Sequence, residues 1–237
     1  SIFTDVNNSR RSTYKGIHSL KDDGFAELEV FDKPFVNYLI KHYLDTKKFK
    51  GNLAAYFKSE SQKGLVRPDK VSLLDSPDVL KKVLNKSSIL DIVCEHLGLG
   101  PKDLMVYPYI DTLINLNVKK IDTGSDNALA FHRDYDGLRA VRVFFYLNEI
   151  KEDDGHHEFI VRSHKNLPLR LRPIRRYTID DIFSALPRKN LKKICGPAGF
   201  GFIENTSGLH RGTEPSSGHR IMLTLSFCDA KSVKNRW

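Results

Sequence analysis

The stretch Phe131-His132-Arg133-Asp134 determines how the second half of the chain is interpreted. Its surroundings, Ala128–Asp134, favour a β-strand, and on a strand the side chains at positions i and i+2 share a face. His132 and Asp134 therefore lie side by side, while Arg133 points away. Two histidines and one carboxylate can hold Fe(II) on one octahedral face, so this pair supplies two of the three ligands of such a site. The third must be a distant histidine on another strand.

Among the nine histidines, His210 is best placed to be that third ligand. It follows the strand expected at Gly199–Glu204 and precedes the strand that Arg220 opens. His164 is interpreted as structural, and His156 lies with His157 in an expected turn. An H-x-D triplet alone is a weak signal, because a surface histidine beside a surface acid is common. The assignment therefore depends on the order of the surrounding segments.

After residue 100 the chain alternates between short segments rich in β-branched or aromatic residues and turn signals such as Asp136-Gly137 and Asp153-Asp154-Gly155. Many short strands at close spacing favour a β sandwich or barrel. The expected strands are Leu104–Tyr109, Leu113–Val118, Ala128–Asp134, Val141–Leu147, Glu158–Arg162, Gly199–Glu204 and Arg220–Phe227.

Before residue 100 the pattern is largely helical. An apolar stripe at helical spacing runs along Pro34–Asp45, whereas Gly64–Ser72 is polar and is expected to be a loop. Ser76-Pro77-Asp78 is a typical helix start, and Gly98 is expected to end the helical region that follows. Thr178–Asp181 resembles a capping box ahead of a short helix.

The composition is that of a globular protein, with 40% hydrophobic and 28% charged residues. A chain of 237 residues is long enough to fold without a disulfide. We expect one domain over residues 1–237, largely helical to about residue 100 and β-rich over 101–230.

Apolar runs such as Val143–Leu147 are far shorter than the roughly 18–20 residues that cross a bilayer, so we expect no membrane span. Residues 1–5 lack the pattern of a secretory signal, and the three cysteines are scattered, which favours free thiols in the cytoplasm.

The positive charge, +9 overall, is concentrated in one segment. Ten Lys or Arg and only two acids lie between Arg162 and Lys193. The segment is either a solvated basic surface or a source of electrostatic field that gathers an anionic ligand. Within it, Leu169–Arg172 alternates apolar and basic residues, which predicts a strand with one apolar and one basic face.

The order of segments after Asp134 is the more specific signal. An apolar strand, Val141–Leu147, is followed by Asp153-Asp154-Gly155, by Arg162-Ser163-His164 and by the glycine-rich Gly196–Phe202, and then by His210 and Arg220. This order resembles the phytanoyl-CoA dioxygenase-like branch of the Fe(II)/2-oxoglutarate oxygenases over about residues 105–228. The resemblance implies a double-stranded β-helix, the cupin-like jelly roll, with helices packed outside it.

By match to the family's H-x-D…H pattern, the resemblance implies that His132, Asp134 and His210 bind the iron. Arg220 then holds the C5 carboxylate of 2-oxoglutarate, a task that suits a permanently charged, forked guanidinium. The implied reaction consumes O2 and releases succinate and CO2. Halogenases of this class carry a small residue in place of the carboxylate, so Asp134 favours hydroxylation.

Two positions depart from the family pattern. Many members have Arg-x-Ser on the last strand, but Met222 stands where that serine would help to hold the carboxylate, and Tyr146 is a candidate replacement. The usual Gly-Ser-His is here Arg162-Ser163-His164.

Two other functions stay open. One is a non-catalytic jelly-roll binding module; the other is a nucleic-acid-directed oxygenase, which the +9 charge suggests. The nucleic-acid demethylase branch has a second Arg six residues after the first, and this chain has Ser226 there, which makes nucleic acid an unlikely partner. Because the basic segment falls between Asp134 and His210, we expect an anionic small-molecule substrate or carrier, with Arg170 and Arg172 as substrate-binding residues.

Overall fold

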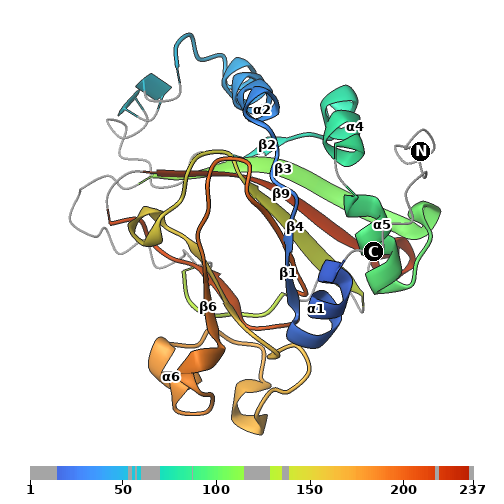
Figure 1. Ribbon diagram of the computed structural model, residues 1–237, viewed down its shortest axis with the longest axis vertical. Coiled ribbons are helices and arrows are strands. Elements are labelled where there is room, and N and C mark those ends of the chain that lie inside the picture. The colour runs from blue at the N-terminus through green and yellow to red at the C-terminus, as the bar shows by residue number, and fades with distance from the viewer. Residues whose placement is uncertain are drawn as a thin grey trace.

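The computed structural model describes residues 15–52, 55–56, 58–59, 70–86, 88–114, 129–134, 139–216 and 219–234. Two antiparallel sheets face each other (Figure 1). The larger has the order β1-β7-β4-β9-β3-β2 and the smaller the order β6-β5-β8. The strands are β1 (Phe25–Leu28), β2 (Val71–Ser72), β3 (Leu104–Ile114), β4 (Ala140–Tyr146), β5 (His157–Ile160), β6 (Leu191–Ile194), β7 (Gly201–Glu204), β8 (His210–Gly212) and β9 (His219–Asp229).

Most helices lie outside the larger sheet (Figure 1). They are α1 (Lys15–Asp23), α2 (Lys33–Thr46), α4 (Pro77–Asn85), α5 (Ile89–Leu97), α6 (Ile179–Phe183) and α7 (Ala230–Lys234), with 3-10 turns at Pro101–Asp103, Glu152–Asp154, Leu169–Leu171 and Arg188–Asn190. None of the helices in the described part of the chain has the length and apolar character that a bilayer crossing requires.

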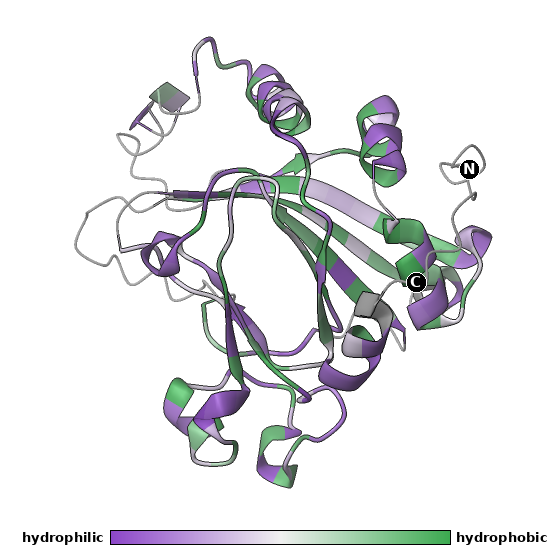
Figure 2. Cartoon of the chain, viewed as in Figure 1, coloured by the Kyte–Doolittle hydropathy of each residue, from purple (hydrophilic) through white to green (hydrophobic). Residues whose placement is uncertain are grey.

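Side-chain alternation on the strands of the larger sheet separates two environments. On β9, the outward set joins a core shared with α2, α4 and α5: Ile221, Leu223, Leu225 and Phe227. The inward set begins with Arg220 and Met222, and Met222 packs in a second core between the two sheets. Figure 2 shows hydrophobic residues concentrated along the strands of the larger sheet. The strands therefore build the core with one face and the interior of the jelly roll with the other.

The core between the sheets is rich in aromatic rings. Phe144 and Phe202 stack at 4.9 Å between ring centroids, and both pack with Phe159 of the smaller sheet. Because these rings belong to both sheets, they hold the two layers together. The β-rich jelly roll with flanking helices that the sequence predicts is confirmed.

Several local predictions are also confirmed. The helix expected at Pro34–Asp45 is α2, Ser76 is the N-cap residue of α4, and Thr178 forms its capping box with Asp181. Gly98 ends α5 in the left-handed conformation with φ 64°.

Other local predictions are wrong. Leu104–Tyr109 belongs to a longer strand, β3, that continues to Ile114 instead of breaking before Leu113. Residues 129–134 make only isolated bridges, at Phe131 and His132. Leu169–Arg172 is no strand, because Leu169–Leu171 form a 3-10 turn.

The N-terminal part also contributes two strands that were not expected. Val71 and Ser72, at the end of the expected Gly64–Ser72 loop, form β2, and β1 comes from the same part of the chain. The expected turn at Asp136-Gly137 and residues 115–118 of an expected strand lie outside the described residues.

One backbone contact between the N-terminal part and the β core predicts a large mutational effect. Gly199 has φ +89°, and a Cβ there would lie 2.2 Å from the carbonyl oxygen of Phe31. We expect Gly199→Ala to lower the free energy of unfolding by more than about 3 kcal/mol, because backbone strain and a clash with backbone act together. Gly98→Ala is the control: its φ is +64°, but a Cβ there meets nothing within 4 Å, so only the strain of about 1–2 kcal/mol remains. Urea unfolding that shows equal losses in the two variants would contradict this interpretation.

Candidate metal centre

A short backbone pairing places the predicted ligands together. The N–H of His132 donates to the carbonyl of His210 at 2.9 Å, and the N–H of His210 donates back to His132 at 2.9 Å. Two residues further on, the N–H of Asp134 donates to the carbonyl of Thr206 at 2.9 Å. The segment that carries His132 and Asp134 is therefore anchored directly against the start of β8 and the turn before it.

The three side chains converge on one point. Nε2 of His132 lies 3.7 Å from Oδ1 of Asp134, Nε2 of His210 lies 3.2 Å from Oδ2, and the two imidazole centroids are 4.4 Å apart. One potential ligand atom from each residue lies within 4.8 Å of the others, and no second group of this kind occurs among the described residues. The structure thus brings together the three residues that the sequence singles out.

The backbone fixes which nitrogen of each ring faces the centre. Nδ1 of His132 lies 2.9 Å from the carbonyl oxygen of Ala130, and Nδ1 of His210 lies 3.0 Å from that of Gly208. A carbonyl only accepts, so each Nδ1 carries a proton and donates. In the neutral form of each ring, Nε2 then carries the lone pair, which is the arrangement that metal-binding histidines usually have.

The donor set fits a divalent cation. Nε2 of His210 and Oδ2 of Asp134 are buried and face each other at 3.2 Å, with Nε2 of His132 on the other carboxylate oxygen. One cation between these atoms can therefore be bound by all three side chains. Two imidazoles and one carboxylate are the donor set of non-haem Fe(II) sites.

The surroundings of the centre keep Asp134 ionised and His132 neutral, whereas Glu204 and Asp134 outweigh burial and raise the pKa of His210. Nη1 of Arg142 lies 2.6 Å from Oδ2 of Asp134. Burial alone would raise the pKa of Asp134, but His210, Arg142 and His132 together hold it well below its usual range. Burial and then the charge of His210 lower the pKa of His132 to about 4. At neutral pH the carboxylate is ionised and the His132 imidazole is neutral, as coordination requires.

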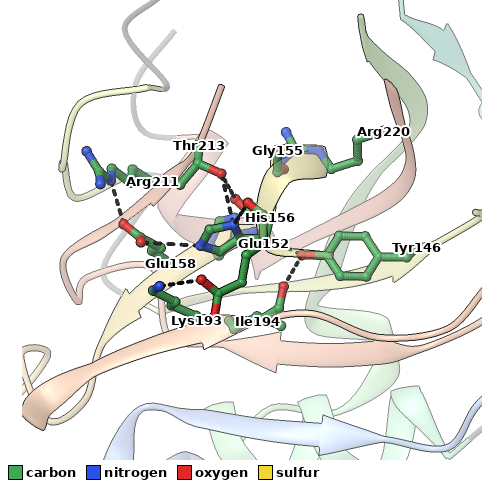
Figure 3. A network of polar contacts seen from close by, with 11 residues as sticks. Tyr146, Glu152, Gly155, His156, Glu158, Lys193, Ile194, Arg211, Thr213 and Arg220 are labelled. Carbon is green, nitrogen blue, oxygen red and sulfur yellow. Dashed lines mark hydrogen bonds and ion pairs between the residues drawn. The ribbon is translucent and has the colours of Figure 1, made fainter. Parts of the chain in front are cut away.

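Arg220, on β9 of the larger sheet, faces the interior from the side opposite β8, which carries His210. Its side chain is buried, and Nη1 donates to the carbonyl of Gly155 (Figure 3). A Cβ on Gly212 would lie 3.2 Å from both terminal nitrogens of Arg220. Gly212 and His210 are two residues apart on β8 and share a face, which corresponds to about 7 Å along the strand. The guanidinium therefore lies against Gly212, two residues along β8 from His210.

The hydroxyl of Tyr146 is bonded to backbone groups of the smaller sheet. It donates to the carbonyl of Ile194 at 2.8 Å and accepts from the N–H of His157 at 3.0 Å (Figure 3). The single proton of this hydroxyl is therefore committed to the backbone, and burial raises the pKa of the group. Tyr146 joins β4 to β5 and β6, and the geometry gives no support to its assignment to 2-oxoglutarate.

The basic segment borders the centre at a residue that sequence reasoning missed. The bridge between Phe131 and Tyr177 places Arg176 across from His132 in the antiparallel register, and the charge of Arg176 contributes to the lowered pKa of His132. Arg170 lies in the 3-10 turn, and Nε of Arg172 donates to the carbonyl of Leu167 at 3.2 Å. The structure brings neither Arg170 nor Arg172 into contact with the three converging residues.

Two further histidines have clear positions. His164 donates from Nε2 to the carbonyl of Lys21 in α1, which agrees with a structural role. His157 lies in β5 and not in a turn, and its Nε2 lies 3.0 Å from Oε2 of the fully buried Glu204. The sequence could have indicated Glu204: it lies two residues after Phe202 on β7, so the alternation of side chains places it on the same inward face.

A cavity of about 320 Å3 flanks Asp134. The end of α5, the start of β4 and the turn after β7 form its walls. Its lining is mostly polar: His96, Leu97, Asp134, Arg139, Ala140, Asn205, Thr206 and Ser207.

Comparisons with known proteins identify the fold. No family model and no curated protein matches the chain. Solved structures do match: the non-heme alpha-ketoglutarate-dependent carbocyclase SnoK from nogalamycin biosynthesis has a TM-score of 0.61 at 14% identity, over 93% of this chain and 85% of SnoK. EvdO2 from Micromonospora carbonacea var. aurantiaca, complexed with 2-oxoglutarate, has a TM-score of 0.62 at 12% identity, over 93% and 92% of the two chains.

A third match is HygX from Streptomyces hygroscopicus with nickel and 2-oxoglutarate bound, with a TM-score of 0.61 at 16% identity over 92% of this chain and 87% of HygX. The chain thus has the jelly-roll fold of non-haem, 2-oxoglutarate-dependent enzymes (α-ketoglutarate is the same compound). The resemblance inferred from the sequence is confirmed at the level of the fold.

Proposed function

We propose that the chain is an Fe(II)- and 2-oxoglutarate-dependent oxygenase whose iron is held by His132, Asp134 and His210. The observation that carries the proposal is the convergence of the three ligand atoms within 4.8 Å, with both Nδ1 atoms tied to backbone carbonyls. The fold shared with 2-oxoglutarate-bound structures supports it.

We also propose that residues 1–237 act as one domain, because β1 from the N-terminal part pairs with β7. The three free cysteines support a cytoplasmic location.

The residues of the chain have distinct tasks in this proposal. Bound iron and 2-oxoglutarate together supply the oxidation of a substrate C–H bond by O2, with release of succinate and CO2. Asp134, kept ionised by His210 and Arg142, and the two oriented imidazoles would hold the iron. Arg220 pairs with the distal carboxylate of 2-oxoglutarate, and Gly212 leaves room for its guanidinium. The aromatic core between the sheets limits the access of water.

We further propose that the oxidation is a hydroxylation. Its basis is the carboxylate of Asp134, because the related halogenases carry a small residue in its place. Solved structures with this fold include a carbocyclase and an epimerase, SnoK and SnoN, so the outcome must be measured.

The metal assignment predicts a specific loss of binding. Each of His132→Ala and His210→Ala removes one of three protein ligands, so we expect Ni(II) affinity to fall at least 100-fold while the fold persists. The measurement is calorimetric titration of the metal-free chain with Ni(II), with circular dichroism as the check on folding. His164→Ala is the control and should bind Ni(II) as the wild type does. Wild-type affinity in His132→Ala would remove the assignment.

The co-substrate assignment separates metal binding from 2-oxoglutarate binding. A buried charged hydrogen-bond pair contributes roughly 1.5–3 kcal/mol, so Arg220→Gln should raise the KM for 2-oxoglutarate about 10- to 100-fold and leave Ni(II) affinity unchanged. Gly212→Ala crowds the guanidinium and should raise the KM in the same direction by less. The readout is succinate release. Arg211→Gln, on the opposite face of β8, is the control, and an unchanged KM in Arg220→Gln would contradict the assignment.

We propose an anionic small-molecule substrate. Support comes from Arg176, which is exposed and lies across from His132, and for which the described residues include no ion-pair partner. Arg139 adds a second cation in the cavity beside Asp134. Arg170 and Arg172 extend the same charged segment and remain candidates for longer-range attraction of the substrate.

A panel of phosphorylated, carboxylated and neutral metabolites tests this proposal. Compounds that stimulate succinate release above the uncoupled rate should be anionic. For such a compound, Arg176→Gln should raise KM about tenfold and change kcat little, because one charge-assisted contact is lost. Arg170→Gln should have a smaller, salt-sensitive effect. Stimulation by neutral compounds alone would refute the anionic class, and no succinate from any compound would favour the non-catalytic binding module.

A further inference from the structure

A buried carboxylate–imidazole pair lies directly behind one of the proposed metal ligands. We propose that Glu204, held by His157, is a positioning residue for His210 that sets the affinity and the reduction potential of the metal centre. This inference rests on the proposed function, because it takes His210 as a metal ligand.

The pair crosses the interior of the jelly roll. Glu204 comes from β7 in the larger sheet and is 0% exposed, and His157 comes from β5 in the smaller sheet and is 4% exposed. Nε2 of His157 lies 3.0 Å from Oε2 of Glu204. The ring of Phe202 lies against His157 with centroids 5.4 Å apart. Apolar residues of similar volume often stabilise such a place better than a buried charged pair, so stability alone does not explain why it is here.

The geometry directs the pair toward His210. Oε1 of Glu204 is buried without a hydrogen-bond partner and lies 4.0 Å from Nδ1 of His210. The rings of His157 and His210 are near parallel, with an interplanar angle of 19° and centroids 5.7 Å apart. The free carboxylate oxygen therefore lies near the nitrogen that is remote from the proposed metal, and His157 fixes the other carboxylate oxygen.

This arrangement acts through the His210 ring. Nδ1 of His210 donates to the carbonyl of Gly208, and the negative charge of Glu204 lies beside that donor. A carboxylate behind a metal-binding imidazole makes the ring a stronger ligand and restricts its rotation. Glu204 is not itself a ligand, because the only potential metal-binding group in the described residues is His132, Asp134 and His210. Its effect must therefore appear in the properties of the metal and not in the coordination number.

The chain contains a matched control. Glu158 is also buried, at 4% exposure, and Oε1 lies 3.3 Å from Nε2 of His156. It follows His157 on β5 but points to the opposite face, where it accepts from Arg211 (Figure 3). Glu158→Gln thus removes a buried carboxylate from a Glu–His pair of the same sheet without touching the environment of His210.

The experiment titrates the metal-free full-length chain with Ni(II) and compares wild type, Glu204→Gln and Glu158→Gln. Loss of a partner behind a ligand typically costs 10- to 100-fold in metal affinity, so that loss is expected for Glu204→Gln. Glu158→Gln should stay within about twofold of wild type, and Glu204→Asp, which keeps the charge, should recover part of the loss. In the iron-loaded chain, the potential of the Fe(III)/Fe(II) couple should be more positive in Glu204→Gln, since removal of negative charge disfavours Fe(III).

The outcomes separate this inference from the proposed function. A wild-type chain that binds no divalent metal overturns both. Wild-type metal affinity and potential in a folded Glu204→Gln overturn this inference alone. If Glu204→Gln does not fold, the double variant Glu204→Met with His157→Leu replaces the pair by apolar residues of similar size, and the same 10- to 100-fold loss is expected of it. Wild-type affinity in that double variant overturns the inference equally.

Discussion

The reciprocal backbone pairing of His132 with His210 is the constraint on which the rest of the site depends. Two hydrogen bonds of 2.9 Å hold the two residues opposite each other, although a large part of the chain separates them in sequence. The pairing fixes both Cα positions, and the alternation of side chains then places Asp134 on the same face as His132. The bonds from each Nδ1 to a carbonyl within the same two segments orient the rings, so the same two segments of backbone direct both Nε2 atoms toward Asp134.

The interior of the jelly roll contains charged groups because each has a defined neighbour. Arg142 lies against Asp134, Glu204 against His157, and Arg220 donates to the carbonyl of Gly155. On β4 the inward Arg142 is followed two residues later by Phe144, whereas Val143 between them packs in the outer core. One face of the strand therefore contributes apolar side chains to the outer core. The other face places both charged and aromatic side chains in the interior of the jelly roll.

The sequence predicts the parts of the site that depend on period and order. The i, i+2 spacing places His132 and Asp134 together, and the place of His210 before the last strand made it a candidate, but the complete ligand set came from the family resemblance. The strands that it misses, β1, β2, β6 and β8, have four residues or fewer, too few for a period to show. Leu169–Arg172 has the period of a strand, but Pro168 precedes it and Pro173 follows it, so no regular ladder of N–H donors exists there. The direction of the Tyr146 proton and the pairing of His157 with Glu204 depend on contacts between sheets, which no local pattern encodes.

The charged groups at the centre and the charged groups of the basic segment have different environments. The charged groups at the centre, Asp134, Arg142 and Glu204, are partly or fully buried and paired, so salt screens them less than exposed charges. Most of the positive surplus instead lies in the exposed segment from Arg162 to Lys193, which approaches the centre where Tyr177 bridges to Phe131. An exposed field of this kind acts over about 8–10 Å at physiological salt and governs encounter more than chemistry. Changes along the segment can therefore alter which ligands reach the site, while the backbone pairing and the buried charges keep the centre itself unchanged.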